Sequence, residues 1–389
     1  KSDRVSRLVV IGAGPMGLEA ALGAVERGFE VTVLEKGRVG ESLRRWGSTR
    51  LFSPLGMNVS GRVMRLLGRD LPPEDALLTG PEMVARVLEP LVSRRPLAGR
   101  VRLGHRVVAV GRARMTRPEM AGHPLRAERP FRLLVETPEG EQVVEAEAVL
   151  DASGVYDIPA AVGAGGVPAR GERPVGARVV RYLGTLEEGL ASLAGREVLL
   201  VGHGHSAANA LERLAGLRPA ALLTWAVRTP NRRPCVEVAN DPLPERRRVV
   251  AQANDLAADP PPFLKVERRA GLEAIEAANG HLGVALSGNR RGEFDAVVGL
   301  TGYRPDLSFL SELALEISPA TEGAARLGRA VARVTDCLSI PKVGPEDLGT
   351  GEPGFHFVGI KAYGRLPTFL LQTGIAQLES ILDLLAARR

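Results

Sequence analysis

A short apolar segment followed at once by closely spaced glycines and a helical pattern occurs twice in this chain. Residues 8–22 read LVVIGAGPMGLEAAL, and residues 198–214 read VLLVGHGHSAANALERL. In a βαβ unit the glycines allow a tight turn and let a pyrophosphate approach the backbone, and the free N–H groups at the helix start face the anion. The repeat therefore predicts two Rossmann-type dinucleotide-binding units and an α/β fold.

The first copy has the full glycine spacing of such a turn. Gly12, Gly14 and Gly17 stand in G-x-G-x-x-G order after the apolar residues 7–11. The next apolar segment ends on Glu35, 18 residues after Gly17, where an acid can bind the ribose of an adenosine. Because all parts follow in order, the first copy predicts an FAD site.

The second copy differs at two informative positions. Ala207 stands where the third glycine would follow Gly202 and Gly204, and the next strand ends on Arg228 instead of an acid. An acid there would repel a 2′-phosphate, whereas a guanidinium can hold one through paired hydrogen bonds. Ser206 adds a hydroxyl at the helix start. We therefore expect NADPH, in preference to NADH, at the second turn.

Two nearby arginines compete with Arg228 for this role. Arg232 and Arg233 follow it closely and could hold the phosphate instead. Arg228 would then be a solvated side chain at a strand end. The sequence leaves both assignments open.

Each glycine unit is followed later in the chain by an apolar strand that runs into a polar turn. These segments are residues 146–159, AEAVLDASGVYDIP, and residues 294–306, FDAVVGLTGYRPD. Ligands of open α/β sheets bind at the carboxyl ends of such strands. Ala152, Gly154 and Gly302 are therefore expected near the cofactors.

Composition excludes several classes of function. The net charge is +6, but the arginines are dispersed and aromatic residues make up only 4%, which argues against a nucleic-acid surface. No apolar run approaches the roughly 20 residues of a membrane span, so we expect no membrane association and a cytoplasmic location. Cys235 and Cys337 form no C-x-x-C motif, and His203 and His205 lie inside the second turn, so no metal site is predicted.

Together these motifs resemble those of flavoproteins with two dinucleotide-binding domains, which include flavin-containing monooxygenases and thioredoxin-reductase-like enzymes. The likeness rests on GAGPMG with Glu35, DASG, GHGHSA with Arg228, TGYRPD, and the terminal FHFVG, IKAYG and RLPTFLLQTG. It implies two Rossmann-like three-layer domains, with an NAD(P)H domain at 159–305 inserted in an FAD domain made of 1–158 and 306–389. It also implies a C-terminal helix that starts near Thr368, after Pro367, and points its positive end at the flavin.

Several departures leave the subfamily open. No C-x-x-C follows Gly204, which excludes the dithiol chemistry of a low-mass thioredoxin reductase. Bacillithiol-disulfide-reductase-like flavoproteins also lack that motif, but they carry a cysteine where this chain has Met16, and a thioether cannot form a mixed disulfide. Ile360 replaces the ribityl-binding acid of thioredoxin reductases, and the F-x-G-x-x-x-H signature of typical monooxygenases is missing from residues 176–186.

The resemblance also supplies the remaining site residues. The loop 41–60 is expected to pass under the flavin, with Phe52 in it, although Trp46 could equally be a packing residue. Lys361, Tyr363 and Arg365 are expected on the substrate side of the flavin, and Arg50, in the loop under the ring, is with Tyr363 and Arg365 a catalytic candidate. The full set of expected cofactor contacts is Gly12, Gly14, Pro15, Met16, Gly17, Glu35, Lys36, Trp46, Arg50, Ser53, Val107, Ala152, Gly154, Gly202, Gly204, His205, Ser206, Ala207, Arg228, Gly302, Gly359 and Thr368.

The segment 230–262 matches the family least. It has a helical middle from about Leu243 to Leu256 between proline-rich edges, which we interpret as a lid beside the nicotinamide. Cys235 either reaches the active site through this segment or is a buried packing residue, the more common state of a free cysteine.

These features predict an FAD-dependent NAD(P)H oxidoreductase in which hydride passes from NADPH to flavin. The favoured hypothesis is a monooxygenase acting on a small molecule. One alternative is a reductase of a small disulfide or another oxidised acceptor, and another is a nucleotide-binding sensor without turnover. A homodimer is the default expectation.

Overall fold

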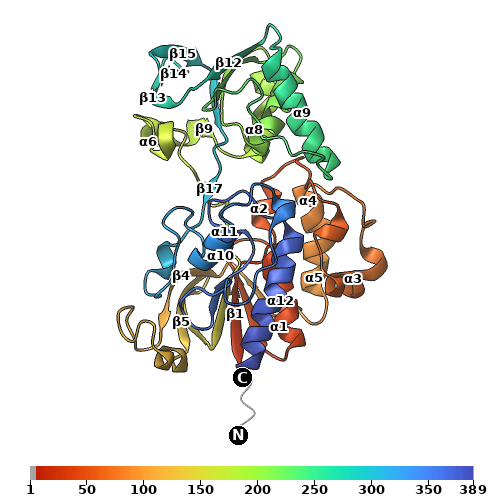
Figure 1. Ribbon diagram of the computed structural model, residues 1–389, viewed down its shortest axis with the longest axis vertical. Helices are drawn as coiled ribbons and strands as arrows, with labels where there is room; N and C mark the ends of the chain where they lie inside the picture. The colour runs from red at the N-terminus through yellow and green to blue at the C-terminus, as the bar shows by residue number, and fades with distance from the viewer. Residues whose placement is uncertain (1–5, 389) are drawn as a thin grey trace.

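The computed structural model describes residues 6–388 and has two lobes (Figure 1). The larger lobe is built on a parallel five-stranded sheet in the order β18-β7-β1-β2-β3. Its strands are β1 (Arg7–Ile11), β2 (Glu30–Glu35), β3 (Val101–Leu103), β7 (Ala148–Asp151) and β18 (Phe355–Phe357). Because β18 comes from the C-terminal part of the chain, both ends of the sequence build this lobe, as an inserted domain requires.

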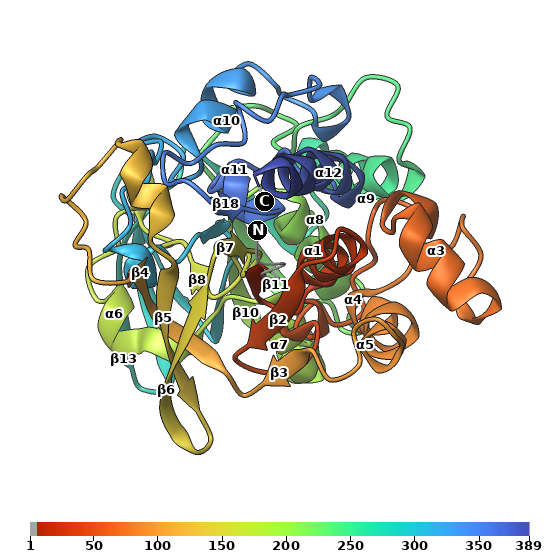
Figure 2. The same ribbon diagram turned by 90° about the horizontal axis from the view of Figure 1, so that it is seen from below.

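Helices and a second sheet cover the two faces of this parallel sheet (Figure 2). The helices α1 (Pro15–Glu26) and α12 (Leu371–Ala387) lie side by side on one face. The antiparallel strands β4 (Arg106–Arg112), β5 (Phe131–Thr137) and β6 (Gly140–Ala146) lie on the other. The smaller helices of this lobe are α2 (Glu41–Arg44), α3 (Gly61–Leu67), α4 (Gly80–Met83), α5 (Glu89–Ser93), α10 (Ala325–Ala330) and α11 (Ile360–Tyr363).

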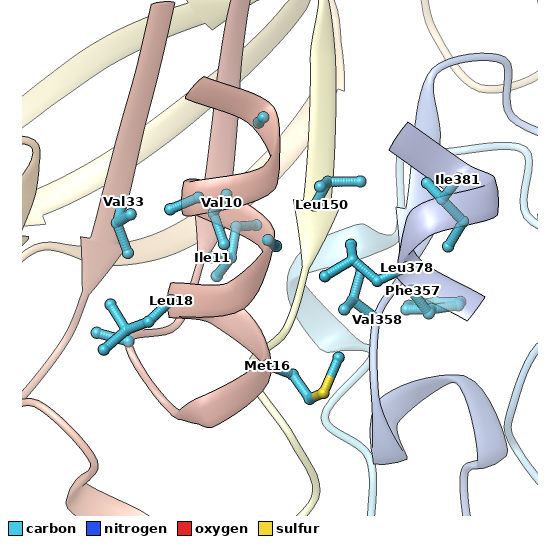
Figure 3. Packing of buried hydrophobic residues seen from close by; sticks show 14 of the residues in the cluster. Val10, Ile11, Met16, Leu18, Val33, Leu150, Phe357, Val358, Leu378 and Ile381 are labelled. Carbon is cyan, nitrogen blue, oxygen red and sulfur yellow. The ribbon is translucent and has the colours of Figure 1, made fainter. Parts of the chain in front are cut away.

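The core of this lobe forms where α1 and α12 meet the sheet (Figure 3). Val10 and Ile11 are buried on the central strand β1, and Leu378 and Ile381 pack toward them from α12. Met16, at the start of α1, points toward the chain around Val358 (Figure 3). The β-branched residues of the first glycine unit therefore form a buried parallel strand, as their pattern predicts.

The second lobe repeats this plan. Its parallel sheet has the order β12-β11-β10-β16-β9, with β10 (Glu197–Val201) in the centre. The other strands are β9 (Val179–Val180), β11 (Leu222–Val227), β12 (Leu264–Arg268) and β16 (Ala296–Gly299), beside an antiparallel sheet of β13 (Leu272–Ala278), β14 (His281–Leu286) and β15 (Arg290–Phe294). Its helices are α6 (Glu172–Val175), α7 (Leu183–Gly189), α8 (His205–Ala215) and α9 (Pro244–Ala258). The α/β fold with two Rossmann-like domains is thus confirmed.

The chain crosses between the lobes twice, side by side. The short strand β8 (Ile158–Pro159) pairs antiparallel with β17 (Tyr303–Arg304), and both lie between the two large sheets. The predicted domain boundaries at 158 and 305 fall in or beside this ribbon.

The prediction for the C-terminal helix was wrong in its start. The helix α12 begins at Leu371, and Pro367 and Thr368 lie in the irregular segment before it, where the Phe369 N–H donates to the Pro367 carbonyl oxygen over 3.1 Å. Phe369 packs on Tyr363 with 5.4 Å between the ring centroids, and Leu370 is still in an extended conformation. Leu370 is the residue directly before the helix, so Thr368 does not cap it, and the buried Thr368 hydroxyl has no hydrogen-bond partner within residues 6–388.

His356 in β18 makes the stability of this lobe pH-dependent. Burial lowers the pKa of its imidazole from 6.5 to about 4, and Nδ1 is 3.0 Å from the Leu348 carbonyl oxygen. Between about pH 6.5 and pH 4 the imidazole of the unfolded protein takes up a proton that the imidazole of the folded protein does not. We expect the free energy of unfolding to fall by about 3 kcal/mol from this group as the pH drops from 7 to 4.

Urea unfolding at several pH values measures this effect. His356→Asn keeps an N–H near the Leu348 carbonyl but cannot titrate, so its stability should change less between pH 7 and pH 4. An equal loss in both proteins would contradict the assignment.

Candidate functional site

One cavity of about 1400 Å³ runs between the lobes and reaches both glycine turns. Most of the predicted site residues line it: Gly12, Gly14, Pro15, Met16, Glu35, Lys36, Trp46, Arg50, Ser53, Val107, Ala152, Gly154, Gly202, Gly204, His205, Ser206, Arg228, Gly302 and Arg365. Residues far apart in the sequence therefore meet at the carboxyl ends of the two sheets, where ligands of this architecture bind.

The first turn fits a pyrophosphate. Gly12 has φ of +102°, and a Cβ there would lie 2.8 Å from the Ala152 carbonyl oxygen. A Cβ on Gly14 would meet nothing within 4 Å, so the backbone at Gly14 is open to the cavity. A Cβ on Gly17 would lie 1.9 Å from the Gly12 oxygen, so Gly17 lets the helix pack on the turn.

Glu35 lies at the cavity end of β2, next to this turn. It is only 8% exposed, and its carboxylate accepts hydrogen bonds of 2.8 Å from the backbone N–H groups of Ala13 and Gly37. These bonds fix the carboxylate beside the turn, where a ribose of the first dinucleotide would lie. Lys36 also lines the cavity and forms an ion pair of 2.6 Å with Asp157.

The second turn has the same geometry with one added contact. Gly202 has φ of +119°, and a Cβ there would lie 2.3 Å from the Leu300 oxygen, whereas Gly204 is open. The buried Trp225 donates from Nε1 to the Gly202 carbonyl oxygen over 2.6 Å. The Trp225 indole therefore fixes the position of the Gly202 carbonyl in the turn. The sequence pattern did not predict this contact.

Only one of the three arginines considered for the 2′-phosphate, Arg228, Arg232 and Arg233, faces the cavity. Arg228 is exposed at the cavity. Arg232 donates to the Ala258 carbonyl oxygen over 2.9 Å, and Arg233 forms ion pairs with Glu237 (2.7 Å) and Asp255 (2.8 Å). Neither Arg232 nor Arg233 lines the cavity. Arg228 is therefore the one of the three that faces it.

The loop after β2 brings the two lobes together. Phe52 makes an edge contact with the ring of His205 at the start of α8, with 5.2 Å between the centroids. Trp46 lines the cavity and packs on Tyr156 with 5.7 Å between the ring centroids, so the packing role is observed and its place at the flavin stays a prediction. Arg50 donates to the Leu77 carbonyl oxygen over 2.6 Å, which anchors its guanidinium within the lining.

A polar clamp ties the same loop to the second lobe. Glu187 in α7 accepts from the backbone N–H (2.7 Å) and hydroxyl (2.6 Å) of Ser48. Arg213 in α8 pairs with Glu187 at 2.9 Å and donates to the Thr49 hydroxyl over 2.7 Å. These four side chains hold the lobes in the arrangement in which both glycine turns face one cavity.

The two histidines of the second turn are held in the neutral form. Burial lowers the pKa of His203, and the nearby Arg228 charge lowers it further. Burial also lowers the pKa of His205, with a smaller contribution from Arg246. The positive charge at this end of the cavity therefore comes from arginine.

A correction concerns five predicted site residues that do not line the cavity, namely the expected cofactor contacts Gly17, Ala207, Gly359 and Thr368 and the catalytic candidate Tyr363. Ala207 is fully buried under its turn, and a Cβ on Gly359 would lie 2.7 Å from Met16 Cγ. Tyr363 is 1% exposed, and its hydroxyl accepts from Gln377 Nε2 over 2.8 Å. These are packing positions around the site, so Tyr363 is no longer a catalytic candidate.

Lys361, also expected on the substrate side, is buried instead. Its ammonium lies 3.3 Å from the Asp151 carboxylate and donates to the Ser153 hydroxyl (2.8 Å) and the Asp306 carbonyl oxygen (2.7 Å). Lys361 therefore connects the end of β7, after which the chain leaves the first lobe, with Asp306, where the chain has returned to that lobe after β17.

Neither cysteine belongs to the cavity. Cys235 is 4% exposed, burial raises the pKa of its thiol to about 12, and its backbone is bonded to the Asn254 side chain. The hypothesis that Cys235 reaches the active site is therefore wrong. Within residues 6–388 no cluster of three or more metal-ligating side chains occurs, and no helix has the length and apolar character needed to span a membrane.

Comparisons with known proteins agree with this geometry. Residues 9–61 match the pyridine nucleotide-disulphide oxidoreductase family, whereas no curated protein sequence matches the chain. Among solved structures, the bacillithiol disulfide reductase of Bacillus cereus is 19% identical with a TM-score of 0.72, over 99% of this chain and 100% of that one.

Two other relatives have different activities in their names. The ornithine hydroxylase of Pseudomonas aeruginosa is 16% identical with a TM-score of 0.65, covering 99% of both chains. The T. acidophilum thioredoxin reductase is 17% identical with a TM-score of 0.59, over 98% of this chain and 99% of that one. The chain thus has the fold of the two-domain FAD- and NAD(P)-binding flavoprotein oxidoreductases, and FAD and NADPH are the cofactors that suit it.

Proposed function

We propose that this protein is an NADPH-dependent FAD monooxygenase that acts on a small molecule. The observation that carries the proposal is the single cavity shared by the two glycine turns. A cavity lined by both turns supports the proposal because both cofactors would open into the same space. The balanced reaction is NADPH + H⁺ + O₂ + substrate giving NADP⁺ + H₂O + oxygenated substrate.

The chain supplies binding, orientation and charge in this reaction. Bound flavin would accept hydride from nicotinamide and reduce oxygen. The backbones at Gly14 and Gly204 would hold the two pyrophosphates. The polar clamp around Glu187 would keep the second lobe against the loop that contains Phe52. Arg50, which donates to the Leu77 carbonyl oxygen, and Arg365, which lies 4.0 Å from the Glu322 carboxylate, are the two catalytic candidates that line the cavity.

The absence of a thiol along the cavity favours oxygen transfer over thiol relay. Neither Cys235 nor Cys337 lines the cavity, and Met16 occupies the first turn, so no side chain there can form a mixed disulfide. A second candidate is direct reduction of a small disulfide or another oxidised acceptor by the flavin. It is favoured by the full-length match to the bacillithiol disulfide reductase fold.

An anaerobic titration of the FAD-loaded protein with NADPH tests the shared core of both candidates. We expect loss of the oxidised flavin absorbance at about one NADPH per flavin. The same titration without any bleaching, by NADPH or NADH, would contradict both candidates and support the non-catalytic sensor.

Oxygen consumption then separates the two candidates. For a monooxygenase, air should reoxidise the flavin, and an acceptor screen should find compounds that lower the hydrogen peroxide released per NADPH while oxygen is still consumed. For a reductase, disulfide or other oxidised acceptors should reoxidise the bleached flavin without oxygen, and this result would reject the monooxygenase.

A further inference from the structure

Two arginines stand side by side at the carboxyl end of the second sheet. The strands β11 and β12 are parallel neighbours, and their last paired residues are Val227 and Arg268. The next residues along the two strands are Arg228 and Arg269. The backbone N–H of Ala270 donates to the Val227 carbonyl oxygen over 3.0 Å, so the two chains are still in contact where these arginines begin.

Both guanidinium groups are available to a ligand. Arg228 and Arg269 are exposed and line the cavity, and neither side chain has a hydrogen bond or ion pair within residues 6–388. The neighbouring Arg268, in contrast, donates to carbonyl oxygens of Asn231, Arg232 and Ala257 over 2.8–3.0 Å. An anion bound between Arg228 and Arg269 would meet two positive charges that no carboxylate within residues 6–388 neutralises.

The backbone at Arg269 is held in an unfavourable conformation. Its φ of 50° lies in the left-handed region, which side chains other than Gly, Asn and Asp rarely adopt. The Arg269 carbonyl oxygen accepts from Arg290 Nη2 (3.2 Å) and the Ser287 hydroxyl (3.4 Å), and its N–H donates to the Thr229 carbonyl oxygen (3.4 Å). Strain of this kind persists where the surroundings enforce it, and it is concentrated at ligand sites.

We propose that Arg228 and Arg269 together form a two-sided clamp for the 2′-phosphate of NADPH. In a Rossmann unit the adenosine ribose lies beyond the end of the second strand, which here is β11. A phosphate there has Arg228 on its own strand end and Arg269 on the next, and each guanidinium can supply a forked pair of hydrogen bonds. Arg269 is then a second specificity residue beside Arg228, and the sequence pattern did not predict it. The clamp rests on the proposed use of NADPH.

Calorimetric titration of the FAD-loaded protein with 2′,5′-ADP and with 5′-AMP tests the clamp. Arg269→Asn removes the guanidinium, and asparagine tolerates the left-handed backbone, so the loop should keep its shape. We expect this variant to weaken 2′,5′-ADP binding about tenfold or more and 5′-AMP binding less than twofold, because one set of charge-assisted bonds to the phosphate is lost.

Arg114→Asn is the matched control. Arg114 is also exposed, also has a positive φ (58°), and lies outside the cavity lining in the other lobe. This variant should bind both nucleotides as the parent protein does. The clamp is overturned if Arg269→Asn leaves 2′,5′-ADP binding unchanged or weakens both nucleotides equally.

The outcome is distinguishable from failure of the proposed function. If the parent protein prefers 2′,5′-ADP but NADPH does not bleach its flavin, the proposed phosphate clamp is supported and the proposed enzymatic function is contradicted. A parent protein whose flavin is bleached equally by NADH and NADPH, with no preference for 2′,5′-ADP, would retain the enzyme and lose the clamp.

Discussion

Glu352→Gln should lower the free energy of unfolding by about 3–5 kcal/mol, because it leaves two buried guanidinium groups without their counter-charge. Glu352 lies between Arg112 (2.8 Å) and Arg126 (2.9 Å), and all three side chains are at most 1% exposed. Its second oxygen also accepts from the Ala314 backbone N–H over 2.8 Å. This triad joins the antiparallel sheet to the segment before β18, so its loss should destabilise the whole first lobe. Urea unfolding followed by circular dichroism measures the change.

Glu316→Gln is the control for this prediction. Glu316 pairs with Arg326 at 2.8 Å, but both side chains are at least 40% exposed. Exposed pairs contribute between zero and about 1 kcal/mol, so this variant should unfold close to the parent protein. Similar midpoints for the two variants would show that the buried triad is not a stabilising centre.

Gly14→Val and Gly204→Val should each remove one cofactor and leave the fold intact. A Cβ at either position meets no protein atom within 4 Å, so the added side chain occupies space open to the cavity, where a pyrophosphate must approach the backbone. Gly14→Val should be purified without bound FAD. Gly204→Val should stay yellow, and its reduction by NADPH should be slowed at least about a hundredfold, because two or more charge-assisted contacts are lost. Flavin absorbance and stopped-flow bleaching measure these outcomes.

Each variant serves as the control for the other. If Gly204→Val loses FAD and Gly14→Val keeps it, the two cofactors are assigned to the wrong turns. Unfolding midpoints of the proteins stripped of FAD should match the parent for both variants, and a fall in either would mean that the backbone needed the glycine for its own folding.

Neighbouring residues in the sequence determined the two nucleotide-binding turns and the succession of strand, turn, helix and strand along the chain. Gly12 and Gly202 have positive φ in a turn directly after a buried strand. Glycine favours this conformation, and the strand, the turn and the helix are consecutive in the sequence, so the turn can be predicted from a few neighbouring residues. The α/β class and the position of the acidic Glu35 follow from the same short-range patterns, whereas the insertion of one domain in the other was implied only by the resemblance of the motifs to a known family. The helix inside the segment 230–262, which the structure extends to Pro244–Ala258, also follows from a short-range pattern.

Tertiary structure alone decided which of several similar side chains face the cavity. Arg228, Arg232 and Arg233 all follow the same strand in the sequence, but Arg232 is bound by the Ala258 carbonyl oxygen and Arg233 by Glu237 and Asp255, contacts that form only when the segment 230–262 folds back on itself. Tyr363 and Lys361 stand beside Arg365, yet their positions in α11 turn them toward Gln377 and Asp151, away from the cavity. Arg269 lies at the same end of the sheet as Arg228 only because β12 pairs with β11. Such choices depend on contacts between residues distant in sequence, and these contacts form only when the lobes and sheets are assembled.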